Sequence, residues 1–180
     1  MEELSLHILD IAENSIKANA SFVTIEIIED IDTDKMEIEI TDNGFGMSDK
    51  MIEKALSPFF STRTTRKIGL GLPLFKDTVE ACEGSIKLTS EINRGTKVYA
   101  SLRHSHIDRP PLGEIADTIL MLVISYPDRD FLYRHKKGNR EFTFDTREIK
   151  EILGTEVSIN HPEVRSWLLE TLKSGEKELN

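Results

Sequence analysis

One short segment, from Ile38 to Met47, restricts the fold of this chain more than any other. It begins as a strand, because apolar side chains occupy every second position over residues 36–40. The strand stops in Asp-Asn-Gly-Phe-Gly at residues 42–46, where glycines permit positive φ and close approach of the backbone to a bound group. This sequence is typical of an ordinary Asn-Gly turn. Alternatively, Asp42 is a carboxylate fixed at the end of a buried strand, where it accepts hydrogen bonds from a planar donor such as an exocyclic amine.

Residues 4–18 have the periodicity of an amphipathic helix. Asp10, Asn14 and Lys17 fall in one narrow arc on its polar side, at i, i+4 and i+7. In the simpler interpretation this arc is a solvated face with an Asp10–Lys17 or Glu13–Lys17 ion pair. In the functional interpretation Asn14 offers an oxygen to Mg²⁺, and Asp10 orients or deprotonates a nucleophile.

A second glycine-rich segment, residues 68–73, opens a helix that is expected to end near Cys82. Gly69 and Gly71 leave backbone N–H groups free at the helix N-terminus, where an anion binds well. The preceding residues 64–67 are polar and basic. A strict dinucleotide fingerprint is excluded because no glycine stands three residues after Gly71, and the sequence contains no Walker A motif.

Charge and cysteine content limit the class of partner. The 180 residues carry a formal net charge of −9 and a single cysteine, Cys82. The acidic balance argues against nucleic acid or an anionic membrane as the main partner. No apolar run reaches the length of a transmembrane helix, and the acidic N-terminus lacks a signal-peptide pattern. We therefore expect a cytoplasmic protein without intrachain disulfides.

Taken in order, these segments resemble the GHKL ATP-binding fold, which gyrase, the large heat-shock chaperones, histidine kinases and mismatch-repair ATPases share. The resemblance covers residues 4–103. Residues 10–15 resemble the N box, 42–46 the first glycine box, 58–60 the F box of kinases, and 69–72 the second glycine box. The implied fold class is α+β: a two-layer sandwich with helices on one face of a mixed β-sheet, followed by a small α+β C-terminal extension.

The resemblance implies a role for each matched residue. Asn14 coordinates Mg²⁺ at the phosphates of ATP, and Asp10 is the catalytic base. Asp42 accepts a hydrogen bond from the adenine N6 amine, assisted by Thr96 through a water. The segment 63–68 forms the lid. The residues expected to bind the nucleotide are Asn14, Lys17, Asp42, Gly44, Gly46, Met47, Phe59, Arg63, Lys67, Gly69, Leu70, Gly71, Leu72 and Thr96.

Two departures from the family pattern bear on the reaction. Hydrolytic members carry glutamate where Asp10 stands, and aspartate is shorter by about 1.5 Å, which puts fast ATP turnover in doubt. The N box begins near residue 4, so the upstream phosphoacceptor helices of a complete sensor kinase are not expected. We expect a stand-alone signalling protein that binds Mg-ATP and transfers phosphate to an unidentified partner protein, as anti-sigma-factor serine kinases do, or hydrolyses ATP slowly. The alternative is a non-catalytic ATP sensor that controls its partner.

The chain is expected to divide into an ATP-binding domain, residues 1–104, and an α+β extension, residues 105–180. For the extension, the resemblance gives no function. Because it is small and apolar, we expect it to pack against the ATP-binding part or against a second copy of the chain, as a homodimer. Its expected parts are a linker at 103–111, a helix at 112–125, a hairpin of strands at 131–135 and 140–144, a helix capped by Asp145 and closed by Gly154, and a last helix ending near Gly175.

Overall fold

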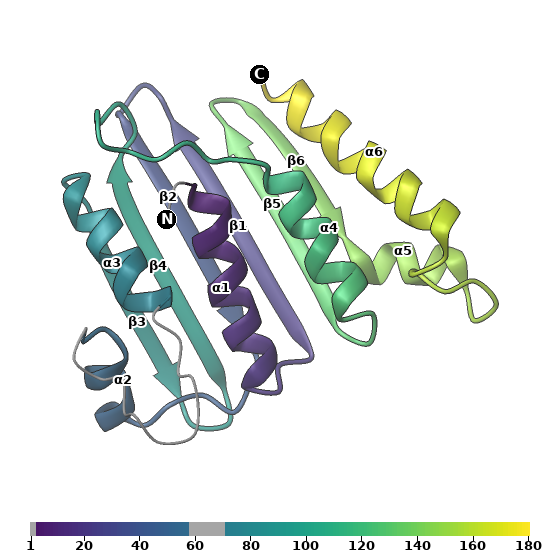
Figure 1. The fold of residues 1–180 in the computed structure, drawn as a ribbon, viewed down its shortest axis with the longest axis horizontal. Helices are drawn as coiled ribbons and strands as arrows, with labels where there is room; N and C mark the ends of the chain where they lie inside the picture. The colour runs from purple at the N-terminus through teal and green to yellow at the C-terminus, as the bar shows by residue number, and fades with distance from the viewer. Residues whose placement is uncertain (1–2, 58–70) are drawn as a thin grey trace.

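The computed structural model describes residues 3–57 and 71–180, and within these residues strands and helices form two layers (Figure 1). The strands are β1 (Phe22–Asp30), β2 (Lys35–Asp42), β3 (Ser85–Glu91), β4 (Gly95–Arg103), β5 (Asp130–Lys137) and β6 (Arg140–Asp145). The helices are α1 (Leu4–Lys17), α2 (Asp49–Ala55), α3 (Gly71–Ala81), α4 (Ile115–Ser125), α5 (Thr146–Leu153) and α6 (Pro162–Glu178). The strands form one mixed sheet in the order β3-β4-β2-β1-β5-β6, with α1, α3 and α4 on one face (Figure 1). The predicted fold class is confirmed.

Alternation along the central strands decides which face of the sheet the helices cover. In β1 and β2 every second side chain is buried, and the register places Ile25 opposite both Ile40 and Tyr133. The apolar arc of α1 packs on this face, as its periodicity predicts. The helix-facing core of these elements consists of Leu4, Ile8, Ile11, Ala12, Val23, Ile25, Ile27, Met36, Ile38 and Ile40.

The C-terminal part of the chain extends the same sheet. β5 pairs with β1 in parallel, from Phe22 opposite Asp130 to Glu29 opposite Lys137, and β6 pairs with β5 antiparallel. α4 lies between α1 and α6 (Figure 1). The expectation that the C-terminal residues pack against the N-terminal part is therefore confirmed, whereas the division into two domains stays a prediction.

Several predicted helix ends differ from those in the structure. The helix predicted to start at Leu112 begins at Ile115, because Gly113 adopts a φ of +81° just before it. The last helix does not end near Gly175 but continues to Glu178. Gly175 lies inside α6, where a Cβ atom would be 2.2 Å from the ring of Phe142 on β6. This glycine permits close packing of helix on sheet instead of ending the helix.

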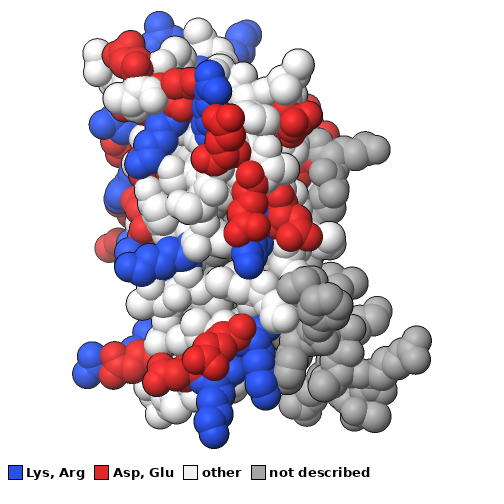
Figure 2. Space-filling view, turned by 90° about the vertical axis from the view of Figure 1, so that its left-hand side faces the viewer, with Lys and Arg blue, Asp and Glu red and all other residues white. Residues whose placement is uncertain are grey.

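One face of the molecule is charged but mixed in sign. On the side that carries α2, α3 and β3, acidic and basic side chains are interspersed (Figure 2). Among the described residues, none of the helices combines the length and the hydropathy needed to cross a membrane.

Candidate functional site

Asp42 ends β2, and its side chain is held from two sides. The residue is 8% exposed. Its Oδ2 accepts a hydrogen bond from the Ser15 hydroxyl at 2.6 Å, and its Oδ1 accepts one from the backbone N–H of Gly44 at 2.8 Å. Each carboxylate oxygen has a further lone pair. The carboxylate is thus fixed in one orientation and can accept another hydrogen bond from a ligand.

The sequence interpretation placed Ser15 in the N-box segment but gave it no role of its own. It is 4% exposed and lies on the side of α1 that faces the sheet, one turn after Ile11. Its hydroxyl also lies 3.4 Å from the carbonyl oxygen of Ile11. A hydroxyl at a core position of an amphipathic helix needs a buried hydrogen-bond partner, so the sequence could have indicated that Ser15 has one. The identity of the partner, Asp42, could not be read from the helix alone.

Asn43, the residue after Asp42, anchors a bend at residues 44–45, where the simpler interpretation predicted a turn. The Asn43 side-chain oxygen accepts hydrogen bonds from the backbone N–H groups of Ser21 and Phe22 at 2.9 and 3.0 Å. Gly46 follows with a φ of +67°, and a Cβ atom there would lie 2.0 Å from the carbonyl oxygen of Glu91. Asn43 and Gly46 thus shape this bend, whereas binding of a planar donor by Asp42 stays a prediction.

Thr96 and Met47 meet at Ser90, which sequence reasoning also missed. Thr96 pairs with Asp42 in the register of β2 and β4. The Ser90 hydroxyl donates to the carbonyl oxygen of Gly95 at 2.7 Å and accepts from the Met47 N–H at 2.8 Å. It also lies 2.9 Å from the Thr96 hydroxyl. Because the Ser90 hydroxyl donates its hydrogen bond to Gly95, it accepts one from the Thr96 hydroxyl. The Thr96 oxygen therefore keeps its lone pairs for a ligand or a water.

An open depression runs along this polar network. Its volume is about 310 Å³, and Asp42, Ser90 and Thr96 are among its lining residues. A polar ligand can therefore approach this end of the sheet from solvent.

Asp10 and Asn14 occupy the exposed side of α1, one turn apart. Burial raises the pKa of Asp10, the nearby carboxylate of Glu13 raises it further, and Lys17 opposes both effects. A carboxylate whose pKa is raised is a better proton acceptor, as a general base requires. The side-chain amide of Asn14 has no hydrogen-bond partner among residues 3–57 and 71–180, so its oxygen is available to a hard cation such as Mg²⁺.

Lys17 forms an ion pair with Glu13, with 3.6 Å between Nζ and Oε2. This is one of the two pairs that the simpler interpretation of the helix face predicted. Such an exposed pair is worth little in stability and is easily exchanged for a ligand. A role for Lys17 in nucleotide binding stays a prediction.

The start of α3 lies against the catalytic candidate on α1. A Cβ atom at Gly71 would lie 3.0 Å from Cβ of Asp10 and 3.2 Å from its Oδ2. Leu72 is half-buried and packs on the core. The other predicted residues of this region lie outside the described residues: Phe59, Arg63, Lys67, Gly69 and Leu70.

Comparison with known proteins gives a family and a fold. A family model described as "Histidine kinase-, DNA gyrase B-, and HSP90-like ATPase" matches residues 2–106, which include all the predicted site residues. The "Probable C4-dicarboxylate sensor kinase" of Halalkalibacterium halodurans is 34% identical over 91 residues, which are 48% of this chain and 17% of that kinase. "Sporulation kinase D" of Bacillus subtilis is 33% identical over 95 residues, which are 53% of this chain and 19% of that kinase. The chain thus matches less than a fifth of the length of either kinase.

Among solved structures, the ATPase domain of MutL from Aquifex aeolicus, complexed with ADP, superposes with a TM-score of 0.53. The superposition covers 85% of this chain and 69% of the MutL chain at 15% sequence identity. At this identity the likeness concerns the fold, and because it covers 85% of the chain it extends beyond residue 106.

Proposed function

Because the chain belongs to the family of histidine kinase-, DNA gyrase B- and HSP90-like ATPases, we propose that it is a cytoplasmic regulatory protein that binds Mg-ATP and acts on a partner protein. The observation that carries this proposal is the Asp42 carboxylate, which Ser15 and the Gly44 N–H hold at the end of β2. A fixed acceptor of this kind is complementary to the N6 amine of adenine. Thr96, opposite Asp42 on β4, supplies a second acceptor beside it.

In this proposal the phosphates lie along α1. Asn14 holds Mg²⁺ through its amide oxygen, and the ion neutralises charge on the phosphate oxygens when bound. Asp10, one turn earlier, accepts the proton of the attacking hydroxyl or water. The raised pKa of Asp10 suits this role, and Asp10 lies against Gly71 at the start of α3.

Two outcomes of ATP binding are open to such a site. In the first, the γ-phosphate passes to a hydroxyl of the partner protein or, slowly, to water. In the second, the protein is a sensor that binds ATP without chemistry and changes its affinity for a partner. The aspartate at position 10, shorter by about 1.5 Å than the glutamate of the hydrolytic members, favours the second outcome.

Radiolabelled ATP separates these outcomes. The full chain is incubated with Mg²⁺, γ-labelled ATP and a partner that co-purifies with it. Transfer of label to the partner, lost in Asp10→Ala but kept in the neighbouring control Glu13→Ala, supports a kinase. Release of labelled phosphate with the same dependence on Asp10 supports a slow ATPase. Tight ATP binding with neither transfer nor release supports a sensor. Failure of the wild-type chain to bind ATP refutes the proposal as a whole.

A further inference from the structure

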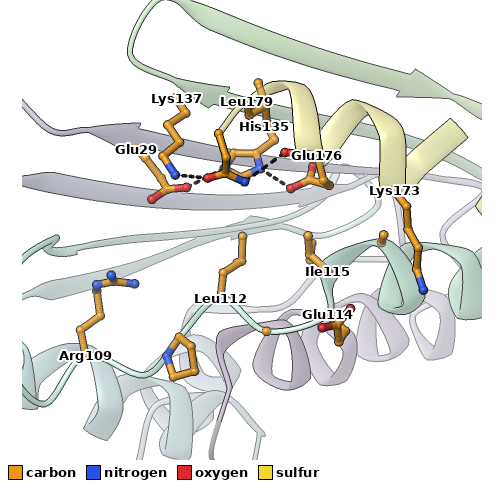
Figure 3. A pocket seen from close by; sticks show the side chains of 14 residues that line it. Glu29, Arg109, Leu112, Glu114, Ile115, His135, Lys137, Lys173, Glu176 and Leu179 are labelled. Carbon is orange, nitrogen blue, oxygen red and sulfur yellow. Dashed lines mark hydrogen bonds and ion pairs between the residues drawn. The ribbon is translucent and has the colours of Figure 1, made fainter. Parts of the chain in front are cut away.

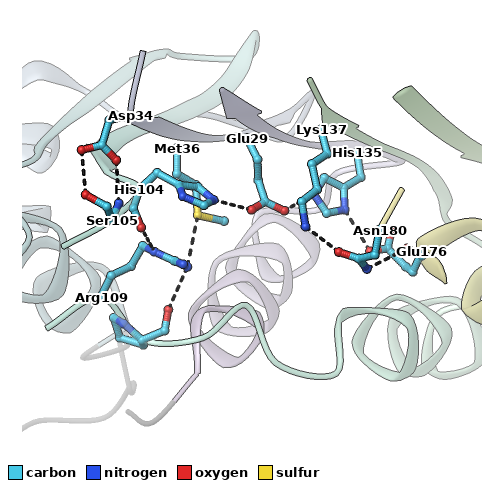
Figure 4. A network of polar contacts seen from close by, with 11 residues as sticks. Glu29, Asp34, Met36, His104, Ser105, Arg109, His135, Lys137, Glu176 and Asn180 are labelled. Carbon is cyan, nitrogen blue, oxygen red and sulfur yellow. Dashed lines mark hydrogen bonds and ion pairs between the residues drawn. The ribbon is translucent and has the colours of Figure 1, made fainter. Parts of the chain in front are cut away.

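Two clusters of polar side chains lie at opposite ends of the helix-facing side of the sheet. The first lines a cavity of about 420 Å³ between the start of α4 and the ends of β5 and α6 (Figure 3). There the two ring nitrogens of His135 lie 3.1 Å from Oε1 of Glu29 and 2.9 Å from Oε2 of Glu176. The second oxygen of Glu29 lies 2.6 Å from Nε2 of His104 (Figure 4), and that of Glu176 accepts from the Tyr133 hydroxyl at 2.7 Å. All the carboxylate oxygens of this cluster therefore have partners.

The charges of this first cluster balance as well. Burial lowers the pKa of His135, but its hydrogen bonds to Glu176 and Glu29 outweigh burial and raise the pKa to about 9. At neutral pH one imidazolium therefore lies between two carboxylates, and the positive charge of Lys137 near Glu29 offsets the excess of negative charge. The cluster is thus satisfied by its own members, both in its hydrogen bonds and in its charge.

The second cluster is a row of three side chains on neighbouring strands: Ser90 on β3, Thr96 on β4 and Asp42 on β2. The register pairs Ser90 with Thr96 and Thr96 with Asp42. Directly opposite residues of antiparallel strands have their side chains on the same face, with Cβ atoms about 4.5–5.5 Å apart. Ser15 of α1 bonds to Asp42, so the row lies on the helix-facing side. The Thr96 hydroxyl stands between the other two side chains and has one proton to donate.

Ser90 decides where that proton goes. The Ser90 hydroxyl lies 2.7 Å from the carbonyl oxygen of Gly95, which can only accept, and 2.8 Å from the backbone nitrogen of Met47, which can only donate. Its single proton is therefore bound to Gly95, and one of its two lone pairs is taken by Met47. The second lone pair remains for Thr96, whose hydroxyl lies 2.9 Å away and must be the donor.

Asp42 keeps an unused acceptor as a result. Each of its oxygens receives one hydrogen bond, from Ser15 or from the Gly44 N–H, and each has a further lone pair. In the part of the chain that the structure describes, no hydrogen bond joins Thr96 to Asp42. Hydrogen bonds to an ionised acceptor are stronger than those between neutral groups. A Thr96 proton that Ser90 did not bind would therefore turn to the carboxylate of Asp42.

We propose that Ser90 is a positioning residue for the nucleotide base: it draws the Thr96 proton away from Asp42 and so keeps the carboxylate open to an amine of the base. Ser90 acts through Thr96. Without the Ser90 hydroxyl, the amine of the base competes with a hydrogen bond inside the protein, from Thr96 to Asp42. Because it takes Asp42 as the acceptor for the adenine amine, this role of Ser90 rests on the proposed function.

The test is isothermal titration calorimetry of the full chain with Mg-ATP. Ser90→Ala should raise the Kd about two- to tenfold, the range that the net contribution of one hydrogen bond implies. Thr96→Val keeps the shape of the side chain but has no proton to donate to Asp42. In a Thr96→Val chain, adding Ser90→Ala should therefore change the Kd by less than about twofold, because the two residues act as one unit. Ser85→Ala, the same change at the exposed start of β3, is the matched control and should bind as wild type does.

Thermal unfolding without nucleotide checks that each variant folds. Should Ser90→Ala not fold, Ser90→Cys takes its place, since a thiol is only a weak donor and acceptor. An unchanged Kd in the folded Ser90 variant overturns the proposed role of Ser90. So does a loss of affinity that is equally large with and without the Thr96 hydroxyl, because Ser90 then supports the structure without acting through Thr96. A wild-type chain that does not bind Mg-ATP refutes the proposed function itself, and the role of Ser90 with it.

Discussion

Replacing Asp42 with asparagine should separate nucleotide binding from folding. The amide of asparagine has the shape of the carboxylate, so its oxygen can still accept from the Gly44 N–H. Its NH₂ group can donate to Ser15, whose hydroxyl turns to accept, because a hydroxyl both donates and accepts. Residue 42 thus keeps both of its hydrogen bonds within the protein, although the bond with Ser15 reverses its direction. On the ligand side, however, an amide N–H faces the adenine amine, donor against donor.

The magnitude follows from the bond that is lost. A hydrogen bond to a charged acceptor contributes about 1.5–3 kcal/mol, and each 1.4 kcal/mol is a factor of ten, so the Kd for Mg-ATP should rise by about ten- to a hundredfold. Isothermal titration calorimetry with the full chain measures this change, and thermal unfolding without nucleotide checks that the variant folds. Asp32→Asn, in the exposed turn between β1 and β2, is the matched control and should bind as wild type does.

An Asp42→Asn protein that is folded and binds Mg-ATP with unchanged affinity would refute this reasoning. Should the variant fail to fold, Ser15→Ala serves in its place, because it leaves the carboxylate intact and removes only the group that orients it. The expected result for Ser15→Ala is weaker ATP binding by several-fold; unchanged affinity in that folded variant would contradict the account equally.

Further predictions concern stability. His135 has a pKa of about 9 against an ordinary value of 6.5, so protonated His135 adds to the free energy of unfolding fully below pH 6.5 and loses this effect as the pH rises toward 9. Urea unfolding across this range should show the loss of stability, and His135→Gln should abolish that pH dependence. Glu29 has its pKa lowered from 4.5 to about 2, so its ionised form stabilises the fold above pH 4.5, and this stabilisation should be lost as the pH falls from 4.5 to about 2. The stability of Glu29→Gln should not show this loss between the two pH values. Gly175→Ala places a Cβ atom against Phe142 and should cost about 1–3 kcal/mol by overpacking, measured by urea unfolding; wild-type stability would contradict the packing.

The sequence predicted those parts of the fold that depend on neighbouring residues. The periodicities of α1, β1 and β2 predict their buried faces, and the Asp-Asn-Gly segment predicts where β2 ends. The role of Ser15 was missed because its partner Asp42 lies 27 residues away, so nothing near it in the sequence explains a hydroxyl in the core.

The pairing of strands that lie far apart in the sequence could not be predicted. The parallel pairing of β5 with β1 joins residues more than 100 positions apart, as the contact of His135 with Glu29 illustrates. No local pattern specifies which strand of the first part a later strand will join. The end of α6 was predicted wrongly because Gly175 was interpreted as a helix terminator, whereas it serves tertiary packing against Phe142.

The proposed function depends on recognition of the adenine amine of Mg-bound ATP by Asp42. The most direct measurement is calorimetry of the full chain with ATP and with inosine triphosphate, which has the same phosphates and ribose but a carbonyl in place of the amine. We expect saturable binding of ATP and a Kd for inosine triphosphate that is higher by about tenfold or more, since a buried carboxylate then faces an acceptor. Equal affinity for the two nucleotides, or no binding of ATP at all, would contradict it.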